Sequence, residues 1–256
     1  SSAASDVYKR QGEWVLLNGN QTALMFVYYL ITRWKELGKI NGKEYIVKTI
    51  VTTETIKTIA ERNGVEMYDV YTGFKWIANV MRENEGKKNY IGGGEESYGF
   101  LCEDFVRDKD AVSACVILAE IAAWAKDQGL SLYQLLQKIY VEYGFSKEKG
   151  ISVVKKGKSG AEEIEAMMKK FRENPLTEIA GSKVTYFYDY STLKGKDYAE
   201  NETVTLDMPT TSNVLQYFTE DNTKVSIRPS GTEPKIKFYC EVHSKVCLLY
   251  TSPSPR

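Results

Sequence analysis

The chain has 256 residues, and its 34 lysines and arginines balance 34 aspartates and glutamates, so the formal net charge is zero. This balance argues against nucleic-acid binding, which usually needs a basic surface, and the most apolar segment, 111–125, is too short to span a bilayer. The cysteines form no CxxC pair and are too sparse for a disulfide framework, so we expect a reducing, cytoplasmic setting and no membrane association.

The first half of the chain alternates between helical and strand patterns. Helices separate the strands at a spacing typical of a mostly parallel sheet. The predicted fold is therefore α/β, with a mixed, mostly parallel sheet and flanking helices. Predicted helices are Gln21–Leu37, Thr53–Arg62, Gly73–Glu83, Lys109–Gln128 and Ser131–Tyr143, and predicted strands are Tyr45–Val51, Val65–Val70 and Asn89–Gly92.

After Gly144 the character of the sequence changes. Ser159 and Glu162 have capping-box spacing before a helix that ends at Asn174, and β-prone segments dominate from there on. We predict a small α+β domain with an antiparallel sheet, and a domain boundary near residues 143–146. Its predicted strands are Val184–Tyr190, Thr203–Leu206, Asn213–Phe218, Val225–Arg228 and Ile236–Val242.

Both ends of the chain lack periodicity and capping residues. Residues 1–11 and 246–256 resemble translated adaptor sequence, and ordinary tails are the alternative. We therefore expect non-native tails at 1–11 and 246–256, a first domain over 12–142 and a second over 143–245. On this interpretation the chain is a piece of a longer protein.

The segment 227–239 indicates phosphate binding. Arg228 offers a planar fork of donors, Ser230 and Thr232 offer hydroxyls, and Gly231 lets the main chain approach a ligand closely. Prolines 229 and 234 restrict the loop. A surface turn is the alternative for Ser-Gly-Thr alone, but the whole stretch favours a phosphate site.

A second loop, 92–100, reads Gly-Gly-Gly-Glu-Glu-Ser-Tyr-Gly-Phe. It follows a predicted strand and so lies at the carboxyl edge of the sheet, where open α/β folds bind ligands. Glu95 and Ser97 can point the same way from an extended backbone, and a carboxylate beside a hydroxyl suits vicinal sugar hydroxyls. An acidic flexible loop is the alternative.

Two further segments are expected at the same edge. Thr72, Gly73 and Lys75 open a helix whose N–H groups and positive end attract anions. Arg107 and Lys109 precede the long helix. Each segment alone is explained by a cap or a solvated turn, but together they favour a shared anionic site.

In this order and spacing, the loops at 94–99, 72–75, 107–110 and 228–234 resemble those of the α-D-phosphohexomutases, with the phosphoglucomutase branch most similar. The resemblance covers residues 12–242. It implies the third and fourth of four domains around one cleft, the fourth being a small antiparallel domain of the type found in TATA-binding protein. The parent protein would be an isomerase of carbohydrate metabolism that moves phosphate between C1 and C6 of a hexose.

The resemblance also implies roles for the site residues. Glu95 and Ser97 would hold the sugar, Lys109 and Arg107 would lie near the reacting end, and residues 72–75 would line the cleft. The loop containing Arg228, Ser230, Gly231 and Thr232 would hold the non-reacting phosphate.

Two family motifs are missing from these 256 residues: the Thr-Ala-Ser-His-Asn loop of the phosphoserine and the Asp-x-Asp-x-Asp-Arg loop of the metal. No metal ligand is therefore assigned here. Mg²⁺ would act in the full-length enzyme, and glucose 1,6-bisphosphate would be its intermediate and activator. His243, the only histidine, lies outside every motif, and we interpret it as a surface residue. Phosphomannomutase, phosphopentomutase and a non-catalytic phosphosugar-binding module remain alternatives, and oligomeric state is open.

Overall fold

The computed structural model describes residues 7–10, 13–155, 157–231 and 233–244. They form two compact units, the first ending at Phe145 and the second running from Ser146 to Ser244. Each unit has a hydrophobic core of its own.

The sheet of the first unit has the strand order β4-β3-β5-β6. Strand β3 runs parallel to β4 and β5, whereas β6 is antiparallel to β5, so the prediction of a mixed, mostly parallel sheet is confirmed. The strands are β3 (Glu44–Thr49), β4 (Glu66–Val70), β5 (Asn89–Gly94) and β6 (Phe100–Cys102), and the helices are α1 (Gly19–Glu36), α2 (Thr55–Arg62), α3 (Phe74–Asn84), α4 (Ala111–Asp127) and α5 (Leu132–Tyr143).

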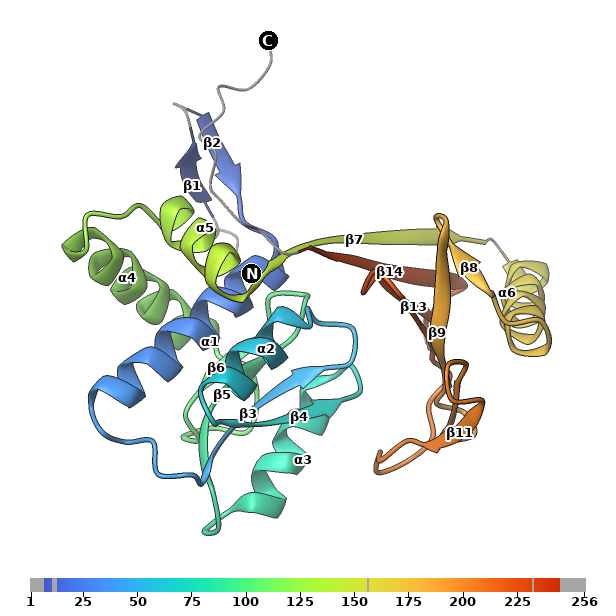
Figure 1. The fold of residues 1–256 in the computed structure, drawn as a ribbon, viewed down its shortest axis with the longest axis horizontal. Coiled ribbons are helices and arrows are strands. Elements are labelled where there is room, and N and C mark those ends of the chain that lie inside the picture. Colours follow the sequence, from blue (N-terminus) through green and yellow to red (C-terminus); the bar gives the residue numbers. More distant parts are fainter. Residues whose placement is uncertain (1–6, 11–12, 156, 232, 245–256) are drawn as a thin grey trace. The chain divides into compact units, whose positions relative to one another are not determined.

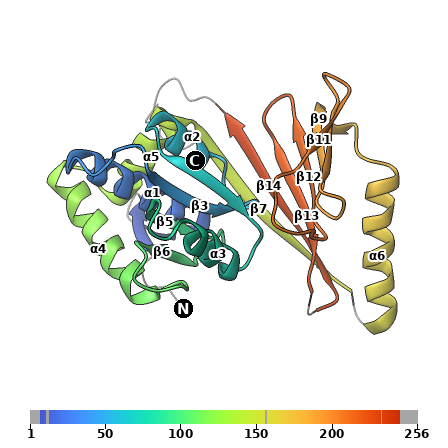
Figure 2. The same ribbon diagram turned by 90° about the horizontal axis from the view of Figure 1, so that it is seen from below.

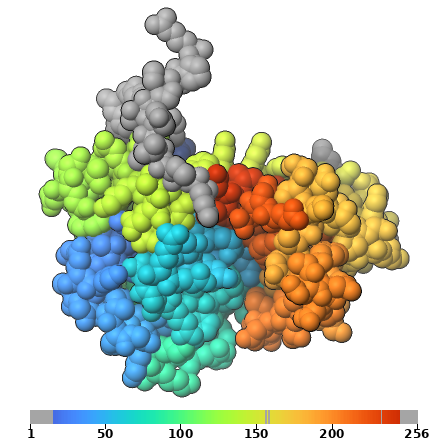
Figure 3. All heavy atoms as spheres, viewed as in Figure 1, coloured from blue at the N-terminus to red at the C-terminus, as the bar shows by residue number. Residues whose placement is uncertain are grey.

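Helices cover both faces of this sheet. Successive side chains of a strand point to opposite faces, so Ile46 joins the core beneath α1, α2, α4 and α5, whereas Tyr45 and Val47 pack against α3. Figure 1 shows α3 on the side of the sheet opposite α1. In the space-filling view α2, in cyan, adjoins α1, in blue, and α5, in yellow-green (Figure 3).

Capping residues explain where two helices begin. Asn18 and Gln21 form a reciprocal capping box, so α1 starts at Gly19, slightly before the predicted Gln21. The predicted box of Ser131 and Gln134 is present at the start of α5. Each box satisfies backbone N–H groups that have no partner within the helix.

Three strands of the first unit, β1 (Val7–Arg10), β2 (Glu13–Leu16) and β6, were not predicted. Strand β6 lies in a segment predicted as loop. Strand β1 pairs antiparallel with β2, although residues 1–11 were predicted to carry no element. Strands this short contain too few residues for a period-two pattern to be visible. The remainder of the predicted tails, residues 1–6, 11 and 246–256, lies outside the described residues.

The second unit has one larger sheet of order β11-β10-β9-β12-β13-β14-β7, with β8 paired to β9. The recorded pairs among β8 to β14 are all antiparallel, as predicted. Its elements are β7 (Phe145–Val154), α6 (Gly157–Glu173), β8 (Glu178–Ile179), β9 (Ser182–Asp189), β10 (Lys194–Asp197), β11 (Glu202–Thr205), β12 (Leu215–Thr219), β13 (Lys224–Pro229) and β14 (Lys235–Ser244).

Helix α6 runs beside this sheet (Figure 2). Ile164 and Met168 pack against the inward side chains of β12 and β13, including Leu215 and Ile227. The prediction was wrong at the start of α6, because Ser159 lies inside the helix rather than at its cap. Strands β7, β8 and β10 were not predicted. Most of β7 is exposed, so its sequence is lysine-rich and shows no alternation.

Candidate functional site

The loop Glu95–Gly99 of the first unit, called here the sugar loop, connects β5 to β6 as a hairpin. The hairpin is closed by the pair Gly94 and Phe100 and by the Glu95 N–H, which donates to the Gly99 carbonyl at 2.8 Å. A Cβ at Gly93 would lie 2.3 Å from the Val47 carbonyl oxygen. The glycine run therefore lets β5 lie close to β3 and brings the sugar loop to the carboxyl edge of the parallel strands.

Glu95 connects the sugar loop to the start of α3. Its side chain is buried, and Oε1 accepts from the N–H of Gly73 at 2.8 Å. Gly73 is the N-cap of α3 and has a φ of 114°, a left-handed conformation that glycine adopts without strain. Glu95 and Gly73, which were predicted to lie at one edge of the sheet, are thus in contact. The Gly73 N–H was expected to attract a ligand anion, but in the structure it donates to a carboxylate of the protein. The negative charge of Glu95 is favourable at the positive end of the helix.

Lys109 also lies beside the sugar loop. A Cβ at Gly99 would sit 2.9 Å from Oε2 of Glu95 and 3.2 Å from Cδ of Lys109, so the carboxylate and the lysine stem pack where Gly99 has no side chain. The Lys109 ammonium is 5.9 Å from the centre of the Phe74 ring and 3.1 Å from Asp108. It is exposed, and a bound anion could displace Asp108.

The other predicted residues of this edge are placed differently. Arg107 forms an ion pair with Glu85 at 3.1 Å, at the far end of α3 from Gly73. Ser97 is exposed at the tip of the sugar loop, and Thr72 is half-buried. Lys75 is exposed, with its ammonium 5.0 Å from the centre of the Trp76 ring. The structure therefore brings Glu95, Gly73 and Lys109 together and leaves Ser97, in the same loop as Glu95, exposed.

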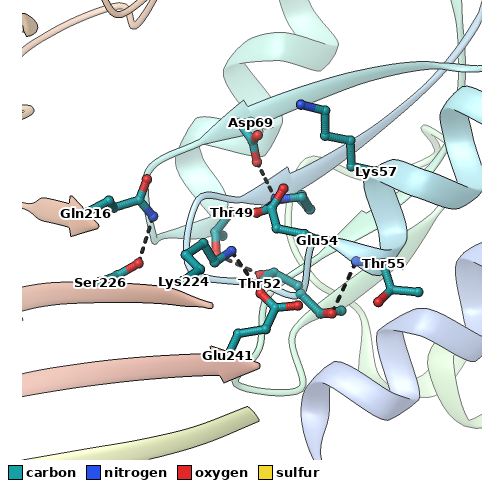
Figure 4. A network of polar contacts seen from close by, with 12 residues as sticks. Thr49, Thr52, Glu54, Thr55, Lys57, Asp69, Gln216, Lys224, Ser226 and Glu241 are labelled. Atoms are coloured by element: carbon teal, nitrogen blue, oxygen red, sulfur yellow. Dashed lines mark hydrogen bonds and ion pairs between the residues drawn. The ribbon is translucent and has the colours of Figure 1, made fainter. Parts of the chain in front are cut away.

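Sequence reasoning missed a buried lysine at the end of β3. Lys48 is 1% exposed, and its ammonium lies 2.7 Å from Asp69 and 3.0 Å from Glu54, both visible in Figure 4. Burial alone would lower the pKa of Lys48, but the two carboxylates outweigh it and raise the pKa above its ordinary value. A lysine within an otherwise β-branched run was the signal that could have identified this network.

Thr49, next to Lys48, joins the strand end to the sugar loop. Its hydroxyl donates to Oε2 of Glu96 at 3.2 Å and lies 2.8 Å from the hydroxyl of Thr52. Both threonines are fully buried. This contact spans 47 residues of the sequence and was not predicted.

The predicted phosphate loop of the second unit connects β13 to β14. Arg228 pairs with Lys237 across the two strands, and the Ser230 N–H donates to the Lys235 carbonyl at 2.8 Å. Gly231 is exposed, with no atom within 4 Å of where its Cβ would lie. Thr232, the fourth predicted phosphate-binding residue, lies outside the described residues. Arg228 and Ser230 are half-buried and so remain partly accessible to a ligand.

The charge around this loop is positive. The basic residues here are Arg228, Lys235 and Lys237, and the nearby acidic residue is Glu233. Glu233 forms an ion pair with Lys235, which lowers the pKa of the Glu233 carboxyl. A cavity of about 550 Å³ lies between the loop and α6, lined by Ile164, Met168, Pro229, Pro234 and neighbouring residues. The local cluster supplies what a phosphate needs although the whole chain is neutral.

Within 7–10, 13–155, 157–231 and 233–244, no group of three or more histidine, cysteine, aspartate or glutamate side chains could hold a metal ion. No helix in these ranges is long and apolar enough to cross a membrane. His243 in β14 is half-buried rather than a fully exposed surface residue, and it lies outside both loops.

The described chain thus consists of two units. The first is a three-layer α/β/α unit that carries a glycine-rich hairpin. The second is an antiparallel unit that carries an Arg-Pro-Ser-Gly loop. Residues 18–143 match the family model of phosphoglucomutase/phosphomannomutase, alpha/beta/alpha domain III, and residues 152–248 match that of the C-terminal domain. The chain belongs to the phosphoglucomutase/phosphomannomutase family.

Curated relatives at moderate identity include two phosphoglucomutases. That of Staphylococcus haemolyticus is 33% identical over 232 residues, covering 91% of this chain and 41% of that protein. That of Staphylococcus aureus is 37% identical over 228 residues, covering 89% and 40%. The chain thus spans about two fifths of the length of these relatives.

Solved structures share the fold. Parafusin, a phosphoglucomutase from Paramecium in an open form, aligns with a TM-score of 0.59 at 15% identity, covering 93% of this chain and 38% of that one. A putative phosphomannomutase from Thermus thermophilus aligns with a TM-score of 0.58 at 17% identity, covering 90% and 38%. At these identities the likeness supports the fold alone.

Proposed function

We propose that these two units are the sugar- and phosphate-binding parts of a phosphosugar mutase, with phosphoglucomutase as the favoured activity. The proposed reaction interconverts hexose 1-phosphate and hexose 6-phosphate. The observation that carries it is the contact of Glu95 with Gly73 and the packing of Lys109 against the same loop, whose residue Ser97 is exposed, at the carboxyl edge of the sheet. The relatives named phosphoglucomutase support the same assignment.

In the proposed mechanism a phosphoserine transfers its phosphoryl group to the sugar. The bisphosphate, glucose 1,6-bisphosphate for a glucose substrate, reorients and returns the other phosphate. Such transfers depend mainly on positioning and on neutralising charge. Ser97 and the second carboxylate oxygen of Glu95 would bind ring hydroxyls, and Lys109, with Arg107 as a weaker candidate, would neutralise charge near the reacting phosphate. Thr72 and Lys75 would line the cleft.

The second unit would hold the phosphate that does not react. The proposed donors are Arg228, Ser230, Gly231 and Thr232. The phosphate at one end of the sugar and then the phosphate at the other end would bind to them. Mg²⁺ would supply charge neutralisation in the proposed full-length enzyme. The described residues contain no group of side chains that could hold it.

Activity measurements on two proteins test the proposal. The 256-residue chain should show no turnover of glucose 1-phosphate with Mg²⁺, because the phosphoserine motif is absent from its sequence. The protein translated from the complete reading frame should be active. Turnover by the 256-residue chain alone, or an inactive complete protein, would contradict the assignment.

The sugar and the alternatives are tested with the complete protein. A panel of glucose, mannose, pentose and glucosamine 1-phosphates should give the highest kcat/KM for glucose. An upstream sequence that lacks both the serine and the metal loops would instead favour a non-catalytic phosphosugar-binding module. We propose a cytoplasmic location and no nucleic-acid partner, and expect no salt-sensitive retention on heparin.

A further inference from the structure

We propose that Gly19 and Tyr98 are positioning residues, which fix the sugar loop to the start of α1 and so hold Ser97 and Glu95 where a sugar can bind. The inference rests on the proposed function, since it concerns the same loop. It adds that a segment outside the loop, Leu17–Gly19, holds the loop in place.

Gly19 provides the first contact. A Cβ there would lie 2.0 Å from the carbonyl oxygen of Glu96 and 2.9 Å from the backbone N of Tyr98. Both atoms belong to the main chain, so they cannot move aside as the end of a flexible side chain can. The sugar loop thus lies directly on the first residue of α1, and only glycine permits this approach.

Tyr98 provides the second contact. Its hydroxyl donates to the carbonyl of Leu17 at 3.1 Å, a bond between residues 81 positions apart. Its φ is 72°, a left-handed conformation that is unusual for a bulky residue. Such a conformation persists only where surrounding contacts determine it, and the contacts to Leu17 and Gly19 are of that kind.

Two further contacts hold the loop on its other sides. Thr49 at the end of β3 donates to Glu96, and Gly73 at the start of α3 donates to Glu95. The loop is therefore attached to α1, β3 and α3, whereas Ser97 at its tip is exposed. Glu96 and Tyr98, the neighbours of Ser97 in the chain, are thus both held by other elements. Such support holds an exposed side chain ready to bind a ligand.

Ligand titrations of the 256-residue chain, followed by backbone-amide NMR, test the proposal. The Tyr98→Phe variant keeps the ring and removes only the hydroxyl. Its affinity for glucose 1-phosphate should fall about fivefold, the loss expected for one neutral hydrogen bond. Gly19→Ala should lower it at least tenfold, because backbone atoms must shift. Tyr198→Phe is the matched control, since Tyr198 is 38% exposed against 40% for Tyr98 and lies in the second unit.

Inorganic phosphate separates positioning from general destabilisation. Its affinity, followed at the amides of the phosphate loop, should be the same in all variants, because that loop does not include residues 17–19 or 98. Equal sugar-phosphate affinity in wild type, Tyr98→Phe and Gly19→Ala would overturn the positioning role while leaving the proposed function intact. A parallel loss of both affinities would also overturn it. Wild-type protein that binds inorganic phosphate but not glucose 1-phosphate would count against the proposed function itself, and the inference with it.

Discussion

The sugar loop and the phosphate loop are supported in different ways. The sugar loop contacts Leu17, Gly19, Thr49 and Gly73, which are far from it in the sequence. The described part of the phosphate loop is held by the pairing of β13 with β14 and the bond from Ser230 to Lys235, and by one distant bond, from the Lys155 N–H to the Pro234 carbonyl at 2.8 Å.

This difference has a consequence for how each loop tolerates change. The shape of the sugar loop depends on the packing of the whole first unit, so substitutions in distant elements should disturb it. The phosphate loop has a shape set by prolines and a local hairpin, so substitutions should act there mainly by removing contacts to a ligand.

The largest expected effect is on catalysis through the phosphate loop. Arg228→Ala in the complete enzyme removes a charge-assisted contact of about 1.5–3 kcal/mol, so kcat/KM for glucose 1-phosphate should fall at least tenfold. The melting temperature should barely change, because Arg228 is not part of the hydrophobic core. Lys169→Ala, at an exposed position on α6, is the control. An unchanged kcat/KM would place the phosphate site elsewhere.

A pair of glycine substitutions compares the loops directly. Gly93→Ala forces a methyl group against the Val47 carbonyl, and overpacking of this kind costs about 1–3 kcal/mol of unfolding free energy. Gly231→Ala meets open space and should leave stability unchanged. Urea unfolding of the 256-residue chain measures both, and equal stability of the two variants would remove the contrast between the loops.

A smaller effect is expected from Thr49→Val. The substitution keeps the shape of a buried side chain but removes its hydrogen bonds to Glu96 and Thr52, each of which costs about 1 kcal/mol. It should also weaken binding of glucose 1-phosphate, since Glu96 belongs to the sugar loop. Thr203→Val, at an exposed position in β11, is the control. Loss of stability with unchanged sugar-phosphate affinity would limit Thr49 to a structural role.

The smallest effect concerns the turn that leads into β13. Hydrogen bonds from Thr219 and Thr223 lower the pKa of Asp221 from 3.8 to about 2. The folded state thus binds this proton less readily than the unfolded state, so the stabilisation is present above pH 4 or so and is lost as the pH falls towards about 2.

Melting temperatures of wild type and Asp221→Asn check this direction. The variant should melt slightly lower at about pH 6, and the difference should disappear at about pH 2. A difference that persists at the lower pH would mean that the carboxylate charge is not its cause.

Much of the fold could be predicted from local patterns. The apolar stripe of α1 and the β-branched run of β3 have the periods of a helix and a buried strand, and both elements form where expected. Strands β7 and β10 could not be predicted, because β7 is mostly exposed and needs no apolar alternation, and β10 has four residues, too few to show a period.

The candidate site was predicted in part. Glu95, Gly73 and Lys109 were expected at one edge and do lie together. The ion pair of Arg107 with Glu85, and the burial of Lys48 between two carboxylates, were not expected. Each depends on which side chains surround a residue, which spacing along the chain does not specify.

The sequence by itself determined the helices, the longer strands, the two loops and the family, because these depend on short motifs and on the periodicity of apolar residues. Only the tertiary structure decided which polar groups the protein itself satisfies and which remain accessible. The Gly73 N–H donates to Glu95, and the start of α1 supports Tyr98, whereas Ser97 stays exposed. The physical reason is that a hydrogen bond forms within about 3 Å, and only folding brings residues 22 or 81 positions apart to that distance.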